Sequence, residues 1–150
     1  MWQIRLAQPT DAVALQACAR AAFEGYVPRM NRAPAPMSAD LTAPIARKEV
    51  HVASAPDGAA LGFVLCRVAG EEMLLDTLAV WPAQAGRGIG RSLVAHIEGA
   101  AHAQGLRAVT LYTNAAMVEN LRFYARLGYV STGRRMQDGF DRVFFRKALV

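Results

Sequence analysis

A strand, a glycine-rich turn and a helix in the middle of the chain constrain the fold more than any other feature. Residues 73–80 (MLLDTLAV) form an apolar run that predicts a buried strand, which ends before Pro82 because proline cannot continue a central ladder. The turn AGRGIG follows at residues 85–90. Apolar residues then recur every four positions, as on one face of a helix, at Ile89, Leu93 and Ile97. The segment therefore predicts a strand that leads into a helix through a glycine turn.

This turn has the features of an anion site. Glycines at alternate positions let backbone N–H groups approach one point, because they lack a Cβ and tolerate positive φ. The free N–H groups of the helix's first turn and the positive end of its dipole face the same point, which favours phosphate. Arg87 and Arg91 add positive charge beside it. The other reading is a glycine turn that binds nothing.

Two familiar phosphate-binding motifs do not match the turn. No Gly-Lys-Ser/Thr follows the glycines, which excludes a Walker A loop. A dinucleotide fingerprint needs a third glycine where this chain has Leu93.

The strand ends in Leu78-Ala79-Val80, and the turn reads Gly86-Arg87-Gly88-Ile89-Gly90. This arrangement resembles motif A of the GNAT superfamily of acyl-CoA-dependent N-acyltransferases, Gln/Arg-x-x-Gly-x-Gly/Ala. Ala85 stands in the Gln/Arg position, with Gln84 displaced by one. Residues 120–129 (NLRFYARLGY) are similar to the family's motif B, Asn-x-x-x-Tyr-x-x-x-Gly-Phe/Tyr. Two motifs in the expected order are more specific than either one alone.

The resemblance implies an α/β fold with a central mixed, mostly antiparallel twisted sheet of about seven strands and about four helices on its faces. The sheet is expected to be splayed between its two parallel central strands, where the pantetheine arm of acetyl-CoA would bond to the first strand's backbone. The acyl-CoA contacts implied by position are Leu78, Ala79, Val80, Gly86, Arg87, Gly88, Ile89, Gly90, Arg91 and Asn120.

Length and composition fit this expectation. At 150 residues the chain suits one domain over residues 1–150, and 53% hydrophobic with 19% charged residues is globular composition. The apolar runs fall short of the roughly 18 residues of a membrane span, and the first residues lack a signal-peptide pattern. We therefore expect a cytoplasmic protein without a membrane partner.

The cysteines and histidines indicate no metal site. Cys18 and Cys66 are expected to be buried free thiols, because they show no Cys-x-x-Cys spacing. The three histidines, His51, His96 and His102, are scattered along the sequence.

The net charge of +5 is spread along the chain without a basic run. Such a distribution does not predict a nucleic-acid partner. An arginine-rich surface also suits the phosphates of coenzyme A, and many of the arginines can be ordinary solvated surface.

Other elements follow from local patterns. Thr10 is expected to cap a helix over residues 11–24 whose inner face carries residues 13, 17, 21 and 14, 18, 22. The further expected elements are a short helix ending near residue 48, a helix over 115–127 with residues 118, 121, 124 and 125 inward, and strands 3–6, 50–54, 61–68, 109–113, 129–133 and 142–148. Strand 109–113 should run parallel to strand 73–80 through a right-handed crossover, and residues 137–139 should form a hairpin turn.

A proline-rich stretch between residues 25 and 44 predicts a shaped loop rather than a regular element. In the resembled family this region covers the acceptor, which makes Tyr26, Met30 and Met37 candidates for the acceptor pocket. Packing over the sheet edge is the alternative.

Acyl transfer from a thioester to an amine needs a neutral amine, a polarised carbonyl and a proton for the leaving thiolate. A phenol with a pKa near ~10 can supply that proton, and the resemblance to motif B assigns this role to Tyr124. Tyr124 could instead be an ordinary core tyrosine, and Asn120 an ordinary solvated polar residue. Asp76 and Glu24 are the candidates for the base that takes the proton of the amine. Either of them could instead be a carboxylate without a catalytic role.

We therefore predict an N-acetyltransferase that moves an acetyl group from acetyl-CoA to a primary amine of a small-molecule or amino-acid-like acceptor by direct attack in a ternary complex. The alternatives are a non-catalytic acyl-CoA sensor and, through the arginines, a nucleic-acid binder. A homodimer is compatible with the resemblance, although no feature of the sequence requires it.

Overall fold

The computed structural model describes residues 1–30 and 32–149. Its strands form one mixed, mostly antiparallel sheet of seven strands in the order β1-β2-β3-β4-β5-β7-β6. The strands are β1 Gln3–Leu6, β2 Val50–Ser54, β3 Ala60–Ala69, β4 Glu72–Val80, β5 Ala108–Asn114, β6 Val130–Gln137 and β7 Phe140–Ala148. The helices are α1 Ala12–Phe23, α2 Val27–Met30, α3 Thr42–Ala46, α4 Ile89–Ala103 and α5 Val118–Arg126. The predicted α/β fold is confirmed.

The chain divides into two compact units. The first unit comprises Met1–Cys66 and Thr77–Ile97, and the second comprises Arg67–Asp76 and residues 98–149. Each of the strands β3 and β4 contributes residues to both units. A single domain over residues 1–150 stays a prediction.

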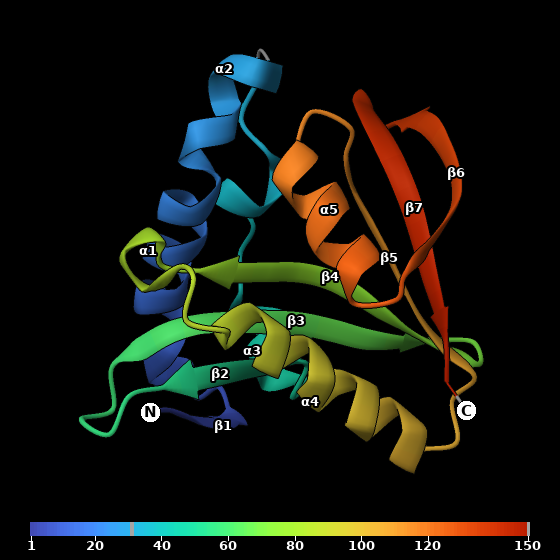
Figure 1. Ribbon diagram of the computed structural model, residues 1–150. Coiled ribbons are helices and arrows are strands. Elements are labelled where there is room, and N and C mark those ends of the chain that lie inside the picture. The colour runs from blue at the N-terminus through green and yellow to red at the C-terminus, as the bar shows by residue number, and fades with distance from the viewer. Residues whose placement is uncertain (31, 150) are drawn as a thin grey trace. The chain divides into compact units, whose positions relative to one another are not determined.

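The first unit is built on three antiparallel strands. β1 pairs with β2 from Gln3 opposite Ser54, and β2 pairs with β3 from Val50 opposite Leu65, as Figure 1 shows for these neighbouring strands. The predicted hairpin of β2 and β3 is confirmed. The core of the first unit contains large, fully buried side chains such as Phe63 of β3 and Leu93 of α4.

The second unit contains the parallel strand pair. β4 runs parallel to β5, with Glu72–Leu75 paired to Ala108–Leu111, as the crossover through α4 predicts. β7 lies antiparallel between β5 and β6, and α5 runs along this group of strands in Figure 1. The predicted turn between β6 and β7 is confirmed: Asp138 and Gly139 have φ of 55° and 80°, the left-handed pair of a type I′ hairpin.

The start and the inner face of α1 differ from the prediction. Thr10 lies inside a 3₁₀ turn, Pro9–Asp11, and the carboxylate of Asp11 instead accepts the backbone N–H of Gln8 at 2.7 Å. The buried residues of α1 are Leu15, Cys18, Ala19 and Phe23, whereas Val13 is 83% exposed. The large side chains therefore decide which face is inward, because alanine is tolerated on either face.

Three further elements differ in their bounds or faces. The stretch predicted as a loop, residues 25–44, includes residue 31 outside the described part of the chain. Its described residues contain the short α2, the end of the 3₁₀ turn Glu24–Tyr26, the 3₁₀ turn Ala35–Met37 and the start of α3. α5 begins three residues later than predicted and buries Tyr124, while Val118 is 44% exposed and Ala125 is also exposed. β6 extends past the predicted residue 133 to Gln137 because the tight turn lets its whole length pair with β7.

Cys18 and Cys66 are buried free thiols, and burial raises the pKa of Cys18 to about 12 and that of Cys66 to about 11. The histidines are less scattered than the sequence suggests, because His96 of α4 and His51 of β2 lie within 3.2 Å of each other. Among the described residues, no three potential metal ligands of the His, Cys, Asp and Glu types gather at one place. In the same part of the chain, no helix has both the length and the apolar character of a membrane span.

Candidate active site

The glycine turn leads directly into α4 and leaves space in front of its backbone. Gly86 and Gly88 adopt φ of 83° and 89°, which only glycine adopts without strain. A Cβ at either position would meet no protein atom within 4 Å. Ile89, the first residue of α4, is 1% exposed and fixes the helix start in the core. The first N–H groups of a helix lack intrahelical acceptors, so the turn and α4 together offer donors to an anion.

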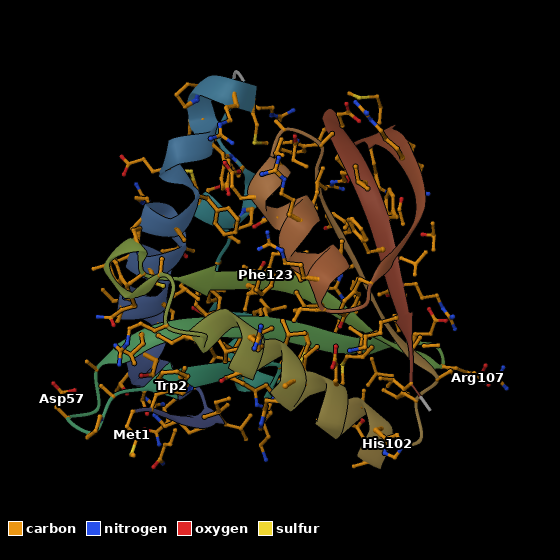
Figure 2. The ribbon with its side chains drawn as sticks, viewed as in Figure 1. Met1, Trp2, Asp57, His102, Arg107 and Phe123 are labelled. Carbon is orange, nitrogen blue, oxygen red and sulfur yellow. The ribbon has the colours of Figure 1, made fainter. Side chains whose placement is uncertain are left out.

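Arg87 is held beside this turn by two neighbours. Its Nη1 donates to Oε1 of Gln84, and its guanidinium carbon lies 5.7 Å from the ring centroid of Trp2, which Figure 2 labels. Gln84 is the residue displaced by one from the family pattern, and here it positions an arginine. Arg91, on the first turn of α4, is exposed.

The end of β4 comes close to β3 because of a glycine that the sequence analysis did not single out. A Cβ on Gly62 would lie 2.7 Å from the carbonyl oxygen of Ala79, and the N–H of Trp81 donates to Leu61 at 3.0 Å. Ala79 is 2% exposed, whereas Leu78 and Val80 are partly exposed. A glycine inside a strand pattern is the signal for such an approach.

Asn120 is anchored within the second unit. Its Nδ2 donates to Oγ1 of Thr113 at 3.4 Å and to Sδ of Met117 at 3.5 Å. Thr113 stands near the end of β5, so these bonds hold the amide of Asn120 at the carboxyl end of that strand.

Tyr124 is packed in an aromatic cluster. Its ring centroid lies 5.0 Å from Phe123 (labelled in Figure 2), 5.7 Å from Tyr129 and 6.3 Å from Phe145. The residue is 5% exposed. Burial raises the pKa of Tyr124 well above its usual value, because the apolar surroundings disfavour the phenolate. Tyr124 therefore keeps its proton at neutral pH.

The two candidate bases differ in environment. Asp76 is only partly buried, because β4 alternates inward and outward residues, and its Oδ2 accepts from Nη1 of Arg67 at 2.7 Å. Glu24 is exposed where α1 ends and a 3₁₀ turn begins. Neither carboxylate is fully buried.

The acceptor-loop candidates lie in the first unit. Tyr26 packs against Phe23 at 6.4 Å and lies 5.3 Å below the guanidinium of Arg29. Met30 and Met37 are partly exposed, and the backbone carbonyl of Met37 accepts from Nε2 of Gln16 at 3.0 Å.

The predicted site residues thus fall into two groups. The first unit holds the end of β4, the glycine turn, Arg91, Glu24 and the three loop residues, and the second unit holds Asp76, Asn120 and Tyr124.

Comparison with known proteins supports the motif assignment. The sequence model described as "Acetyltransferase (GNAT) domain" matches residues 46–131, more than half of the chain. A GCN5-related N-acetyltransferase from Rhodopseudomonas palustris is 26% identical, with a TM-score of 0.80 over 99% of this chain and 96% of that one.

Two further solved structures share the fold. PaiA N-acetyltransferase from Thermoplasma acidophilum, in complex with coenzyme A, has a TM-score of 0.78 at 19% identity over 99% of both chains. The ribosomal-protein-S18-alanine N-acetyltransferase from Escherichia coli has a TM-score of 0.75 at 18% identity over 99% of this chain and 94% of that one. Since the family's sequence model also matches more than half of the chain, the chain belongs to the GNAT family and is an acyl-CoA-dependent N-acyltransferase.

Proposed function

We propose that the chain transfers an acetyl group from acetyl-CoA to the primary amine of a small-molecule or amino-acid-like acceptor, by direct attack in a ternary complex. Residues 1–150 would act as a single acetyltransferase domain.

The glycine turn carries this proposal. Gly86 and Gly88 have left-handed backbone and open space where a side chain would stand, and α4 begins at the next residue. This arrangement fits the pyrophosphate of a coenzyme A molecule, with Arg87 and Arg91 as additional cations. By their motif positions, Leu78, Ala79 and Val80 would supply backbone contacts to the pantetheine arm.

Tyr124 is proposed as the general acid. The acceptor nitrogen attacks the thioester carbonyl, a C–N bond forms, the C–S bond breaks, and the phenol donates its proton to the leaving sulfur. A buried phenol suits this step because it stays protonated through neutral pH. Asn120 would bond the pantetheine arm from the preceding turn of α5.

The amine must lose a proton, and Asp76 and Glu24 are the proposed acceptors, directly or through water. Asp76 already accepts from Arg67, so a proton on that carboxylate would compete with the ion pair. Replacing each residue by its amide and measuring rate against pH distinguishes them, because only the true base variant loses the acidic limb.

The remaining proposals concern the acceptor pocket, the cellular location and the oligomeric state. Tyr26, Met30 and Met37 would line the acceptor pocket. A cytoplasmic location is supported by the two free buried thiols, which suit a reducing compartment. We also propose a homodimer, which sedimentation would test by measuring the mass of the protein in solution.

The first experiment is calorimetric titration with acetyl-CoA and CoA, followed by a thiol-release assay over a panel of amines. Micromolar binding with turnover of at least one amine is the expected result. Binding without any turnover would instead support the acyl-CoA sensor, and absence of binding would overturn the assignment of the glycine turn.

A further inference from the structure

Arg142 of β7 is an unusually buried charge in the second unit. Its side chain is 10% exposed, yet its only ion pair within the described residues is with Asp138, a carboxylate that is itself 78% exposed. Arginine side chains are rarely buried to this degree unless a paired anion compensates them. An exposed aspartate in a hairpin turn is weak compensation for a buried guanidinium.

The bonds of Arg142 leave most of its donors available. Nη1 donates to Oε1 of Gln137 at 2.8 Å and to Oδ2 of Asp138 at 3.2 Å. Within the described residues, no fully buried side-chain nitrogen lacks a partner, so Nε and Nη2, which make neither of these bonds, each keep some contact with solvent. The edge of the guanidinium that Nε and Nη2 form matches a carboxylate.

Aromatic rings hold this fork in place. The guanidinium carbon of Arg142 lies 4.3 Å from the ring centroid of Tyr112, and that ring packs against Phe144 at 5.7 Å. Arg135 lies over the other ring, 3.9 Å from the centroid of Phe144. Stacked rings restrict the orientation of the guanidinium and exclude water from its faces.

Two arginines and two carboxylates act on Tyr112. Arg67 pairs with Asp76 at 2.7 Å, and Arg142 pairs with Asp138 at 3.2 Å. Because Asp138 is exposed to solvent, water screens its attraction to Arg142, and a ligand carboxylate can add to the compensation of the buried guanidinium.

The strand register places this cluster at the carboxyl end of β5. Arg142 lies directly opposite Asn114 at the end of β5, and the preceding residue, Thr113, accepts the amide of Asn120. Successive strand residues point to opposite faces of the sheet, so Arg142 and Tyr112 lie at the same end of β5 as Thr113 and Asn120 but on the other face.

We propose that Arg142, stacked on Tyr112, binds a carboxylate of the acceptor, so that the preferred acceptors are primary amines that carry a carboxylate, as amino acids do. This inference rests on the proposed function. The carboxylate would bind at Nε and Nη2, while Nη1 keeps its bonds to Gln137 and Asp138.

The experiment compares amino acids with the amines that lack only the carboxylate: leucine with 3-methylbutylamine, and phenylalanine with phenethylamine. The wild-type enzyme is expected to prefer the amino acid of each pair in kcat/KM. Arg142→Met should lower that preference by about 10- to 100-fold, the usual value of a hydrogen bond to a charged group. Arg142→Lys should retain part of the preference, and thermal unfolding checks that both variants fold.

Arg134→Met is the matched control. Arg134 lies on the same hairpin with an exposed ion pair to Asp141 at 2.7 Å, and its loss should leave the preference unchanged. An equal preference in wild type and Arg142→Met, or no preference in the wild type, would refute the carboxylate site.

A binding assay separates this inference from the proposed function. Calorimetry with N-acetylleucine and N-(3-methylbutyl)acetamide should show tighter binding of the carboxylate compound, and loss of that difference in Arg142→Met. A binding preference without turnover of any amine would overturn only the proposed function. Turnover without a carboxylate preference would overturn only the carboxylate site, as would a lower CoA affinity of Arg142→Met, which would assign the guanidinium to a coenzyme phosphate.

Discussion

Tyr124 combines burial with a raised pKa, and its role can be tested by removing one oxygen atom. Tyr124→Phe keeps the ring contacts with Phe123, Tyr129 and Phe145. Loss of the proton donor should lower kcat by about 100-fold or more while the acetyl-CoA affinity stays within about twofold. Steady-state kinetics and calorimetry give both quantities.

The neighbouring tyrosine provides the control. The hydroxyl of Tyr129 donates to Oε2 of Glu98 at 2.8 Å. Tyr129→Phe should cost about 1 kcal/mol or more in unfolding free energy, because it leaves a carboxylate oxygen short of a partner, but it should retain kcat. Equal kcat in Tyr124→Phe and wild type would show that Tyr124 is a core residue only.

The His51 and His96 pair predicts acid sensitivity. Burial, followed by the nearby His96, lowers the pKa of His51 below its usual range. The unfolded chain then binds more protons than the folded one, so stability is present above about pH 6.5 and is lost as pH falls through the lower folded value. Urea unfolding between about pH 5 and pH 8 should show this loss. For the uptake of one proton, the free energy of unfolding should fall by at most about 1.4 kcal/mol per pH unit.

Variants of the other histidines test the cause. His96→Gln removes the neighbouring imidazole and should reduce the acid loss of stability in part, because burial is the larger cause of the lowered pKa of His51. His102→Gln, at an exposed position on the same helix, should leave the limb as in the wild type. An unchanged slope in His96→Gln would show that His96 does not contribute.

At the scale of elements, the turn before α4 and the turn after it each contain a glycine with the same backbone conformation, so one can serve as the control for the other. Gly88 and Gly105 have φ of 89° and 74°, and a Cβ at either position would meet no atom within 4 Å. Alanine at each should therefore cost a similar free energy of unfolding, about 1 to 2 kcal/mol. Only Gly88→Ala should weaken acetyl-CoA binding, by about 10-fold or more, because its methyl group would fill the space in front of the donors.

Calorimetry and thermal unfolding of the two variants decide this. Equal affinities in Gly88→Ala and Gly105→Ala would show that the turn does not hold the ligand. A lower affinity in both would point to a general loss of structure instead.

Local patterns predicted the elements well where a special residue marks them. The turn at Gln137, Asp138 and Gly139 could be predicted from the sequence because positive φ restricts the residue type. The inner face of α1 could not, because alanines occur on every side and only packing distinguishes Leu15 from Val13. The predicted cap at Thr10 is also wrong, because the carboxylate of Asp11 accepts the backbone N–H of Gln8.

For the whole molecule, the order of elements determined the sheet, whereas the site depended on contacts across the sequence. The parallel pairing of β4 and β5 followed from the helix between them. The proximity of His51 to His96, and of Arg142 to Tyr112, needs a register that no local pattern encodes. The candidate residues within motifs A and B could thus be proposed from the sequence, whereas the cluster of Arg142 and Tyr112 could not.

The last prediction concerns the stability of the whole chain in the presence of its donor. A ligand that binds only the folded chain adds about 2.7 kcal/mol at 100 times its Kd. For a chain of 150 residues this corresponds to a rise in Tm of roughly 5 to 10 °C. Acetyl-CoA should produce this rise in the wild type and in Gly105→Ala, but a smaller one in Gly88→Ala at the same concentration.

A duplex oligonucleotide is the control for the net charge of +5. Binding through scattered arginines would be weak and would fall steeply with added salt, so the duplex should not raise Tm at about 0.15 M salt. The acetyl-CoA shift should persist there, because backbone donors at a helix start hold the phosphates in a fixed geometry. A larger shift with the duplex than with acetyl-CoA would make nucleic acid the preferred ligand and would contradict the proposed function.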